Sequence, residues 1–218
     1  MEKSKHLTEK LQKKKKCRIL FSVVFASGTW YLMASPLLTL LDGQLIFGYD
    51  NLKRRDTMEQ DLQFMDEALR LAREAAAEGE VPVGCVIVRG SEIVGRGRNR
   101  RETKKTALGH AEIEAIAEAC SNLGGWRLWE CTLYVTLEPC PMCAGAIVNA
   151  RIPRVVFGAS DTKCGACGSV CDLFSMEFNH HPQVETGLLE EECAQLLTEF
   201  FQNLRLELRD RPKWKRPQ

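Results

Sequence analysis

The chain has 218 residues, of which 44% are hydrophobic and 27% are charged, and this composition excludes a disordered or fibrous protein. The length allows one ordinary domain with a full core and leaves about fifty residues over. The formal net charge of +1 hides an uneven split, because residues 1–57 carry eleven Lys and Arg against five Asp and Glu, whereas the remaining residues carry nineteen against twenty-four.

The first 57 residues contain the stretch KKKKCR and then an uncharged run at 19–41, which hydropathy alone would allow to be a signal anchor or a membrane helix. Serines, threonines, a glycine and a proline make this run a poor membrane span. Codons for KRRDTM can also spell a ribosome-binding sequence just ahead of Met58. We therefore expect residues 1–57 to be an N-terminal extension, either a translated leader or a hydrophobic segment, and residues 58–218 to form the working domain. A membrane partner is expected only if residues 19–41 insert.

The region after Met58 begins with an amphipathic helix and a β-hairpin. Residues 61–79 end in a glycine and carry one apolar stripe at helical spacing, formed by Leu62, Met65, Leu69 and Ala72. The apolar segments at 81–88 and 91–98 flank a turn at Arg89-Gly90, which predicts a hairpin.

Helices and strands then alternate. The pattern predicts a helix at 110–121, a buried strand at 131–137, a helix at 140–150 and a strand at 153–159. An irregular stretch runs to Pro182, and a long helix at about 190–208 follows, with an apolar side of Phe200, Phe201 and Leu204. A leading helix followed by the order β-β-α-β-α-β-α indicates a three-layer α/β domain.

Two cysteines and a histidine form the most informative motif. Pro139 follows a strand, and Cys140 and Cys143 then stand one turn apart at a helix N-terminus, where free N–H groups and the helix dipole favour thiolates. Such a pair can also be redox-active, but thioredoxin-like proteins place it after a first strand and lack an upstream His partner. His110 supplies a third ligand. Three protein ligands leave one tetrahedral position open, which is typical of catalytic rather than structural zinc.

Glu112, two residues past His110, is the candidate proton carrier. Residues i and i+2 do not share a helix face, so its carboxylate is expected to reach a zinc-bound water, whose pKa the metal lowers to about 7, and not the metal itself. The alternative is that His110 merely caps a helix and Glu112 favours its positive end. Together, His-x-Glu and Pro-Cys-x-x-Cys are the signature of zinc-dependent nucleobase deaminases.

From about residue 61 to residue 206 the chain resembles the bacterial tRNA-specific adenosine deaminases, which convert the wobble adenosine of a tRNA anticodon to inosine. The matching segments are EVPVG at 80–84, GRNR around Asn99, HAEI at 110–113, LYVTLEPCPMCAGAI at 133–147, RVVFGASDTKCGACGS at 154–169, FNH at 178–180 and FF at 200–201. The resemblance implies a cytidine-deaminase-like, three-layer α/β/α sandwich with a mixed five-stranded sheet. It also implies a homodimer in the cytoplasm that acts on a tRNA anticodon stem-loop, expected to be that of an arginine tRNA.

The resemblance further implies roles for individual residues. One zinc ion per subunit would be held by His110, Cys140 and Cys143, and Glu112 would move protons during attack at C6 of adenine. Residues expected to contact the substrate are Asn99, which would bind the flipped-out nucleotide, and Asp161, Asn179 and His180, which would lie near the anticodon loop.

Some positions depart from the family pattern. Leu108-Gly109 stands where Thr-Ala is usual, and this glycine is expected to loosen the backbone beside the pocket. His181 replaces an arginine that could face phosphate. The segment at 96–105 carries six cations and one anion, which suits docking of an RNA backbone as well as an ordinary solvated face.

The ten cysteines are irregularly spaced, and several lie in apolar runs, so reduced thiols in the cytoplasm are expected rather than a disulfide framework. Cys164, Cys167 and Cys171 could suggest a second metal, but the glycines around them favour tight packing.

Two other functions stay open. One is a zinc deaminase of a free nucleobase, nucleoside or nucleotide of guanine or cytidine type. The other is a binding module that keeps zinc without chemistry, although such a module would be expected to lack Glu112.

Overall fold

The structure is a computed structural model that describes residues 22–26, 29–33 and 46–209. The chain divides into two compact units, Met1–Arg55 and Asp56–Gln218. Helix α2 (Ile46–Ala77) begins in the first unit, and its residues from Asp56 onward belong to the second.

The first unit contains a two-stranded antiparallel sheet. Strand β1 (Ser22–Ala26) pairs with β2 (Thr29–Met33), with Ser22 opposite Met33 and Ala26 opposite Thr29. Both strands fall within the uncharged run at 19–41, and their β-branched and aromatic residues suit strands. The rest of that run lies outside the described residues. No helix in the part of the chain that the structure describes combines the length and the apolar character needed to cross a membrane.

The second unit is built on a five-stranded mixed sheet. Its strands are β3 (Gly84–Arg89), β4 (Glu92–Arg98), β5 (Cys131–Leu137), β6 (Arg154–Ala159) and β7 (Gln183–Thr186), in the spatial order β4-β3-β5-β6-β7. β3 runs antiparallel to both β4 and β5, whereas β5, β6 and β7 are parallel. Three further helices, α3 (Ala111–Leu123), α4 (Pro141–Ala150) and α5 (Glu190–Arg209), and the short 3₁₀ helix η1 (Leu173–Ser175) complete it.

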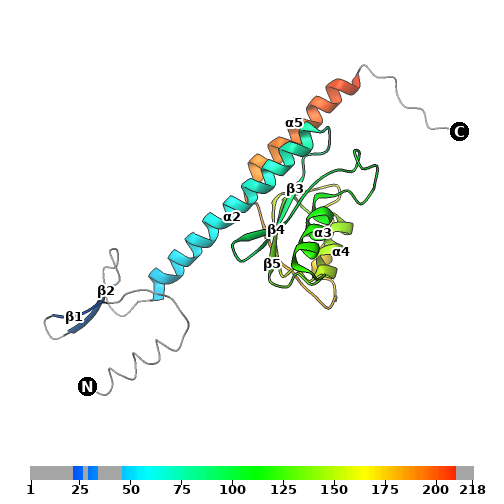
Figure 1. Cartoon of the computed structure of the whole chain (residues 1–218). Coiled ribbons are helices and arrows are strands. Elements are labelled where there is room, and N and C mark those ends of the chain that lie inside the picture. The colour runs from blue at the N-terminus through cyan, green and yellow to red at the C-terminus, as the bar shows by residue number, and fades with distance from the viewer. Residues whose placement is uncertain (1–21, 27–28, 34–45, 210–218) are drawn as a thin grey trace. The chain divides into compact units, whose positions relative to one another are not determined.

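The helices cover both faces of this sheet. Figure 1 shows α2 and α5 side by side on one face, with α3 and α4 on the other. Because successive strand residues point to opposite faces, Cys85 and Ile87 of β3 pack under α3 and α4, whereas Val86 and Val88 pack against α2 and α5. The predicted three-layer α/β/α sandwich with a mixed five-stranded sheet is confirmed.

Some details of the elements differ from the sequence prediction. The prediction treats the stretch up to Pro182 as irregular and assigns no element between it and the helix at about 190–208, but β7 follows Pro182 directly and pairs in parallel with β6. Four residues with exposed Gln183 and Glu185 carry too little apolar pattern to be recognised. In α5 the buried position is Cys193, with Ala194, Leu196 and Leu197 packed beside it, whereas Phe201 is 39% exposed.

Helix α3 lies close against β4 because the strand has glycines where the helix crosses it. A Cβ on Gly97 would come within 2.0 Å of the Ala111 carbonyl oxygen and 2.6 Å of the Ala115 nitrogen. We therefore expect Gly97→Ala to lower the free energy of unfolding by about 3 kcal/mol, measured by urea denaturation. Gly125→Ala is the control, since no atom lies within 4 Å of its Cβ position, and it should change stability by less than about 0.5 kcal/mol. Equal effects would contradict the close-packing argument.

A cluster of polar side chains links helix α2 to strands β5, β6 and β7. Arg154 pairs with the Asp61 carboxylate at 2.6 and 3.0 Å and with Glu185 at 2.7 and 2.8 Å, and the Tyr134 hydroxyl donates to Asp61. Burial raises the pKa of Asp61, but the hydrogen bonds from Arg154 and Tyr134 outweigh it and hold the pKa below its ordinary value. The ionised Asp61 therefore stabilises the fold above the pKa of the unfolded chain, about 4, and this contribution is lost as the pH falls through the folded pKa.

We expect Asp61→Asn to lower the free energy of unfolding by about 2 kcal/mol at pH 7, because the half-buried Arg154 guanidinium loses one of its two carboxylate partners. The difference in free energy of unfolding between this variant and the unchanged protein should shrink as the pH falls below about 4, because Asp61 becomes protonated as the pH passes through its lowered pKa. Urea denaturation at pH 7 and pH 3 checks both statements. Asp66→Asn, at an exposed position of the same helix, should not differ in this way from the unchanged protein in its free energy of unfolding. If the stability difference between Asp61→Asn and the unchanged protein did not change with pH, the stabilising role of the ionised Asp61 would be contradicted.

Candidate active site

Three strands end at the same edge of the sheet. β4 and β5 both run antiparallel to β3, so they point the same way, and β6 runs parallel to β5. Their carboxyl ends therefore share one edge, and the segments that follow them meet there. In open α/β sheets this is the edge at which ligands bind.

The N-termini of α3 and α4 bring the sequence motif to this edge. His110 is the N-cap of α3, and Cys140 is the N-cap of α4, with Pro141 in the first turn. Neither side chain makes a capping hydrogen bond. His110 therefore occupies the N-cap position without capping the helix through its side chain, and its imidazole is available to other groups.

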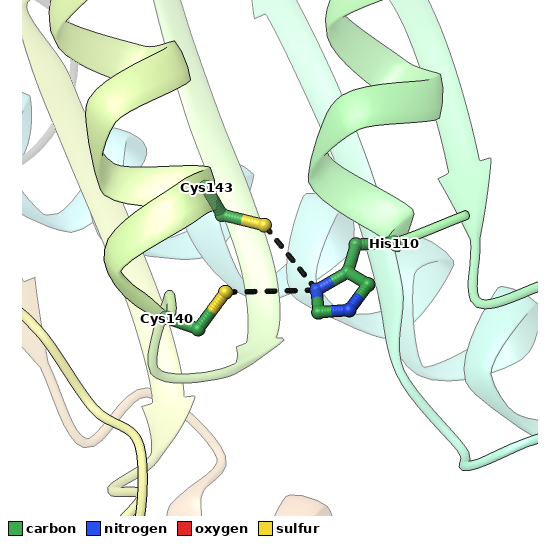
Figure 2. Close-up of side chains that lie close together, drawn as sticks. All are labelled: His110, Cys140 and Cys143. Carbon is green, nitrogen blue, oxygen red and sulfur yellow. Dashed lines mark hydrogen bonds between the residues drawn. The ribbon is translucent and has the colours of Figure 1, made fainter. Parts of the chain in front are cut away.

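The histidine and the two cysteines converge. The Cys140 Sγ lies 3.6 Å from His110 Nδ1 and the Cys143 Sγ lies 3.5 Å from the same nitrogen, as Figure 2 shows. All three ligand atoms lie within 4.8 Å of one another. Among the described residues this is the single group of three or more His, Cys, Asp or Glu side chains arranged to hold a metal ion.

The donor set and its spacing fit a tetrahedral metal. With a metal–nitrogen bond of about 2.05 Å and metal–sulfur bonds of about 2.3 Å, nitrogen and sulfur at two tetrahedral corners are about 3.6 Å apart. The two Sγ–Nδ1 distances of 3.5 and 3.6 Å agree with that value. One imidazole and two thiols therefore form a site that could hold one metal ion and leave a fourth position to another ligand.

The three groups also shift one another's protonation. A hydrogen bond from Cys143 lowers the pKa of Cys140 to about 4, and the same hydrogen bond, together with burial, raises the pKa of Cys143. The hydrogen bond to Cys140 raises the pKa of His110. The lowered pKa of Cys140 favours its thiolate, which is the form that binds metals.

Glu112 lies beside this group and is buried, with 4% of its surface exposed. Burial raises the pKa of Glu112 to about 7, and the charge of Cys140 adds to the rise, while a hydrogen bond with Cys143 opposes it. A carboxyl group in this environment can both accept and donate a proton near neutral pH. The thiol of Cys85, fully buried on β3, has its pKa raised by burial and by the charge of Glu112.

Asn99 follows β4 at the same edge. It is 8% exposed, its backbone N–H donates to Val83, and its Nδ2 donates to Glu80 at 3.3 Å. The next residue is tied to the segment before His110, because the Arg100 N–H donates to the Gly109 carbonyl at 2.8 Å. The amide of Asn99 is therefore hydrogen-bonded to Glu80, and the residue after Asn99 is tied to the residue before His110.

Glu80, which the sequence prediction does not single out, organises this segment. Its side chain is fully buried and accepts hydrogen bonds from the backbone N–H groups of Glu102 and Thr103 at 3.2 and 2.7 Å. Gly109, expected to loosen the backbone, is instead packed closely, since a Cβ there would lie 2.9 Å from the Arg100 carbonyl group. The segment between β4 and α3 is therefore firmly anchored.

Asp161 lies after β6, also at this edge. Its Oδ1 accepts hydrogen bonds from the N–H groups of Lys163 and Cys164, and its own N–H donates to Glu138. Asn179 and His180 lie elsewhere. They precede β7, whose amino end is at the opposite edge, and the His180 Nε2 contacts the Ile152 carbonyl at 2.7 Å. Within one chain the structure does not bring Asn179 and His180 to the metal-ligand group.

The basic segment at 96–105 is largely paired with acidic side chains. Arg96 contacts Glu67, Arg98 contacts Glu74 and Glu78, and Arg100 and Lys104 contact Glu114. Several of these residues line a groove of about 560 Å³ together with Leu108 and Ile113. Cys164, Cys167 and Cys171 are not arranged as a metal-binding group among the described residues, and Cys164 and Cys171 are exposed, so the expected tight packing does not hold for these two.

Comparisons with known proteins agree with this geometry. The family model of the MafB19-like deaminases matches residues 59–205. The tRNA-specific adenosine deaminase of Bacillus subtilis is 52% identical over 149 residues, which cover 68% of this chain and 92% of that protein. A solved structure from studies of A-to-I editing by tRNA:A34 deaminases at the wobble position of transfer RNA is 46% identical, with a TM-score of 0.60, and covers 62% of this chain and 99% of the other.

A guanine deaminase from Nitrosomonas europaea has a TM-score of 0.52 at 23% identity, covering 64% of this chain and 83% of the other, which shows a shared fold alone. The much higher identity to the tRNA enzymes, extending over nearly their whole length, distinguishes them from this neighbour. The chain belongs to the family of tRNA-specific adenosine deaminases.

Proposed function

We propose that this protein hydrolyses adenosine to inosine at the wobble position of a tRNA anticodon. The observation that carries the proposal is the convergence of His110, Cys140 and Cys143 beside the buried carboxyl group of Glu112. The membership of the tRNA-specific adenosine deaminases supplies the substrate class. The proposal assigns the deaminase domain to residues 58–218 and treats residues 1–57 as an extension outside it, which the family match at 59–205 supports.

One zinc ion per chain is the proposed cofactor, held by His110, Cys140 and Cys143. When bound, zinc supplies a Lewis acid that makes a water molecule acidic enough to attack at neutral pH. The remaining chemistry belongs to Glu112. Its carboxylate takes one proton from the attacking water and delivers it to the ring nitrogen, and it then takes the proton of the new C6 hydroxyl group and delivers it to the amine, which leaves as ammonia. Burial beside the ligand group supports this role, because the carboxyl is within reach of the reacting atoms and shielded from bulk water.

Asn99 and Asp161 are the proposed substrate contacts. Both lie at the edge where β4, β5 and β6 end, and both belong to segments fixed by hydrogen bonds. A buried amide such as that of Asn99 can hold a flipped-out nucleotide with little loss of side-chain entropy. The fixed backbone on both sides of the ligand group supports recognition of one extruded base.

The proposed partner is an arginine tRNA, and the proposed assembly is a homodimer in the cytoplasm. Asn179 and His180, at the opposite edge of the sheet, could then contact RNA bound to the second copy. Exposed apolar side chains offer surface for such an interface, among them Leu108, Trp126, Trp129 and Phe178. The cations at 96–105 would have to exchange acidic partners for phosphates on binding, so they favour docking only modestly.

The test is incubation of the full chain, with zinc, with an arginine anticodon stem-loop that carries adenosine at the wobble position. Nucleosides are then separated after complete digestion. We expect inosine from this RNA and none from a stem-loop in which the only anticodon adenosine is moved by one position. Free adenosine, guanine and cytidine are tested in parallel for ammonia release. Release from a free base without conversion of the RNA would favour the alternative deaminase of free bases and contradict the proposal.

A further inference from the structure

Glu138 connects two parts of the candidate site that are distant in sequence. It stands between the end of β5 and the Pro139-Cys140 turn that carries a metal ligand, and it is 2% exposed. Its backbone N–H donates to the Ala159 carbonyl at 2.9 Å, so it lies beside the end of β6. A buried carboxylate with no role in the proposed chemistry needs hydrogen-bond donors to remain charged.

The donors come from one segment, residues 161–169. Oε2 accepts from the Asp161 N–H at 3.0 Å and from the Ser169 hydroxyl, and Oε1 accepts from the N–H groups of Cys167 and Ser169 at 2.9 and 3.1 Å. Four donors fill the acceptor positions of an ionised carboxylate. Gly165 packs so closely on the same group that a Cβ there would lie 2.3 Å from Oε2.

The segment is also attached to the ligand turn itself. The Ala166 N–H donates to the Pro139 carbonyl at 2.9 Å, and the Gly165 N–H donates to the Asp161 carbonyl at 2.8 Å. Asp161 Oδ1 accepts hydrogen bonds from the N–H groups of Lys163 and Cys164 and so stabilises the turn that begins at Asp161. The segment after β6 is therefore one hydrogen-bonded unit folded around a single carboxylate.

We propose that Glu138 is a positioning residue that fixes the segment at 161–169 and so holds Asp161 next to the metal-ligand turn for substrate binding. The inference deepens the proposed function and rests on it for the role of Asp161. Fixing the segment in advance means that its ordering entropy is not lost when the nucleotide binds. Hydrogen bonds from backbone N–H groups to a carboxylate are the strong, charge-assisted kind, which suits this task.

The test is a double-mutant cycle on Glu138 and Asp161. In Glu138→Gln the shape is kept, but an amide N–H₂ now faces backbone N–H donors. We expect kcat/KM for the stem-loop RNA to fall by about tenfold, with the metal content of the chain unchanged. In a chain that already carries Asp161→Ala, the same change should lower kcat/KM by less than about twofold, because the two residues act as a unit. Glu185→Gln, an exposed carboxylate on β7, is the control and should stay within about twofold of the unchanged protein.

If the two substitutions lower kcat/KM by factors that multiply in the double variant, the inference is overturned. Loss of the metal in Glu138→Gln would also overturn it, because it would show that Glu138 supports the metal ligands and not the segment. If Glu138→Gln does not fold, Ser169→Ala takes its place in the cycle, with an expected fall of about threefold that disappears in the Asp161→Ala background.

A second measurement does not depend on activity. Amide hydrogen exchange at Asp161, Cys167 and Ser169 should be at least about tenfold faster in Glu138→Gln, or in Ser169→Ala where that variant replaces it, than in the unchanged protein. Unchanged protection would overturn the inference even if the enzyme is active. If the unchanged protein forms no inosine while the substituted protein still shows the faster amide exchange, this pair of results would contradict the proposed function and would still support the positioning of the segment by Glu138.

Discussion

Replacing Glu112 with Gln is expected to lower kcat for inosine formation by about 10²- to 10⁴-fold, the range associated with loss of a general acid–base group. The amide has almost the same shape as the carboxyl group but cannot take up a proton at neutral pH. Metal content should remain unchanged, because Glu112 is not among the three side chains whose ligand atoms converge. Single-turnover conversion of the stem-loop and elemental analysis of the same sample measure both quantities.

Glu114→Gln provides the matched control on the same helix. Glu114 pairs with Lys104 and Arg100, whose side chains are 48% and 33% exposed, and it is not among the converging ligand atoms. Its activity should stay within about threefold of the unchanged protein. Full activity in Glu112→Gln would show that another group carries the proton and would contradict the proposed mechanism.

Replacing Cys143 with Ala should abolish stoichiometric metal binding and reduce inosine formation by at least about 10³-fold, since a catalytic metal contributes several kcal/mol to lowering the barrier. Cys143 is completely buried and is one of the two cysteines in the candidate ligand group found among the described residues. The melting temperature should fall by about 5–10 °C, because an ion that binds the folded state more tightly than the unfolded state no longer stabilises it. Elemental analysis, RNA conversion and thermal unfolding are measured on one preparation.

The control for this variant is Cys120→Ala, which removes a half-buried thiol from α3. It should keep its metal and about half or more of its activity. Restoring activity to the chelator-treated wild type by adding zinc, but not to Cys143→Ala, would link the two losses. A Cys143→Ala chain that keeps one equivalent of metal would show that the ligand set is different.

The sequence predicts the fold and the ligand group well because both depend on patterns of residue type and spacing. Short, nearly continuous apolar runs identify β3, β5 and β6, and helical spacing identifies α3 and α5. His110, Cys140 and Cys143 are recognisable because few other arrangements use this combination at two predicted helix starts. The structure adds the reason that they meet, which is that β4 and β5 point in the same direction on either side of β3.

The sequence does not indicate residues whose role depends on hydrogen bonds with backbone groups far away in the chain. Glu80 and Glu138 are ordinary glutamates in the sequence, yet each is buried and accepts hydrogen bonds from N–H groups about twenty to thirty positions away. Strand β7 was missed because it is short and mostly exposed. The distance between His180 and the ligand group likewise depends on strand direction, which local patterns do not specify.

The separation of the ligands along the chain has a further consequence. His110 and Cys143 are 33 positions apart, so an ion held by both closes a covalent-like loop in the polypeptide. By analogy with disulfide crosslinks, such a loop lowers the conformational entropy of an unfolded chain that keeps the ion bound, and this raises the free energy of the unfolded chain by about 4 kcal/mol. A polypeptide that opens without releasing its ion therefore remains tethered, and refolding begins from a much smaller set of conformations.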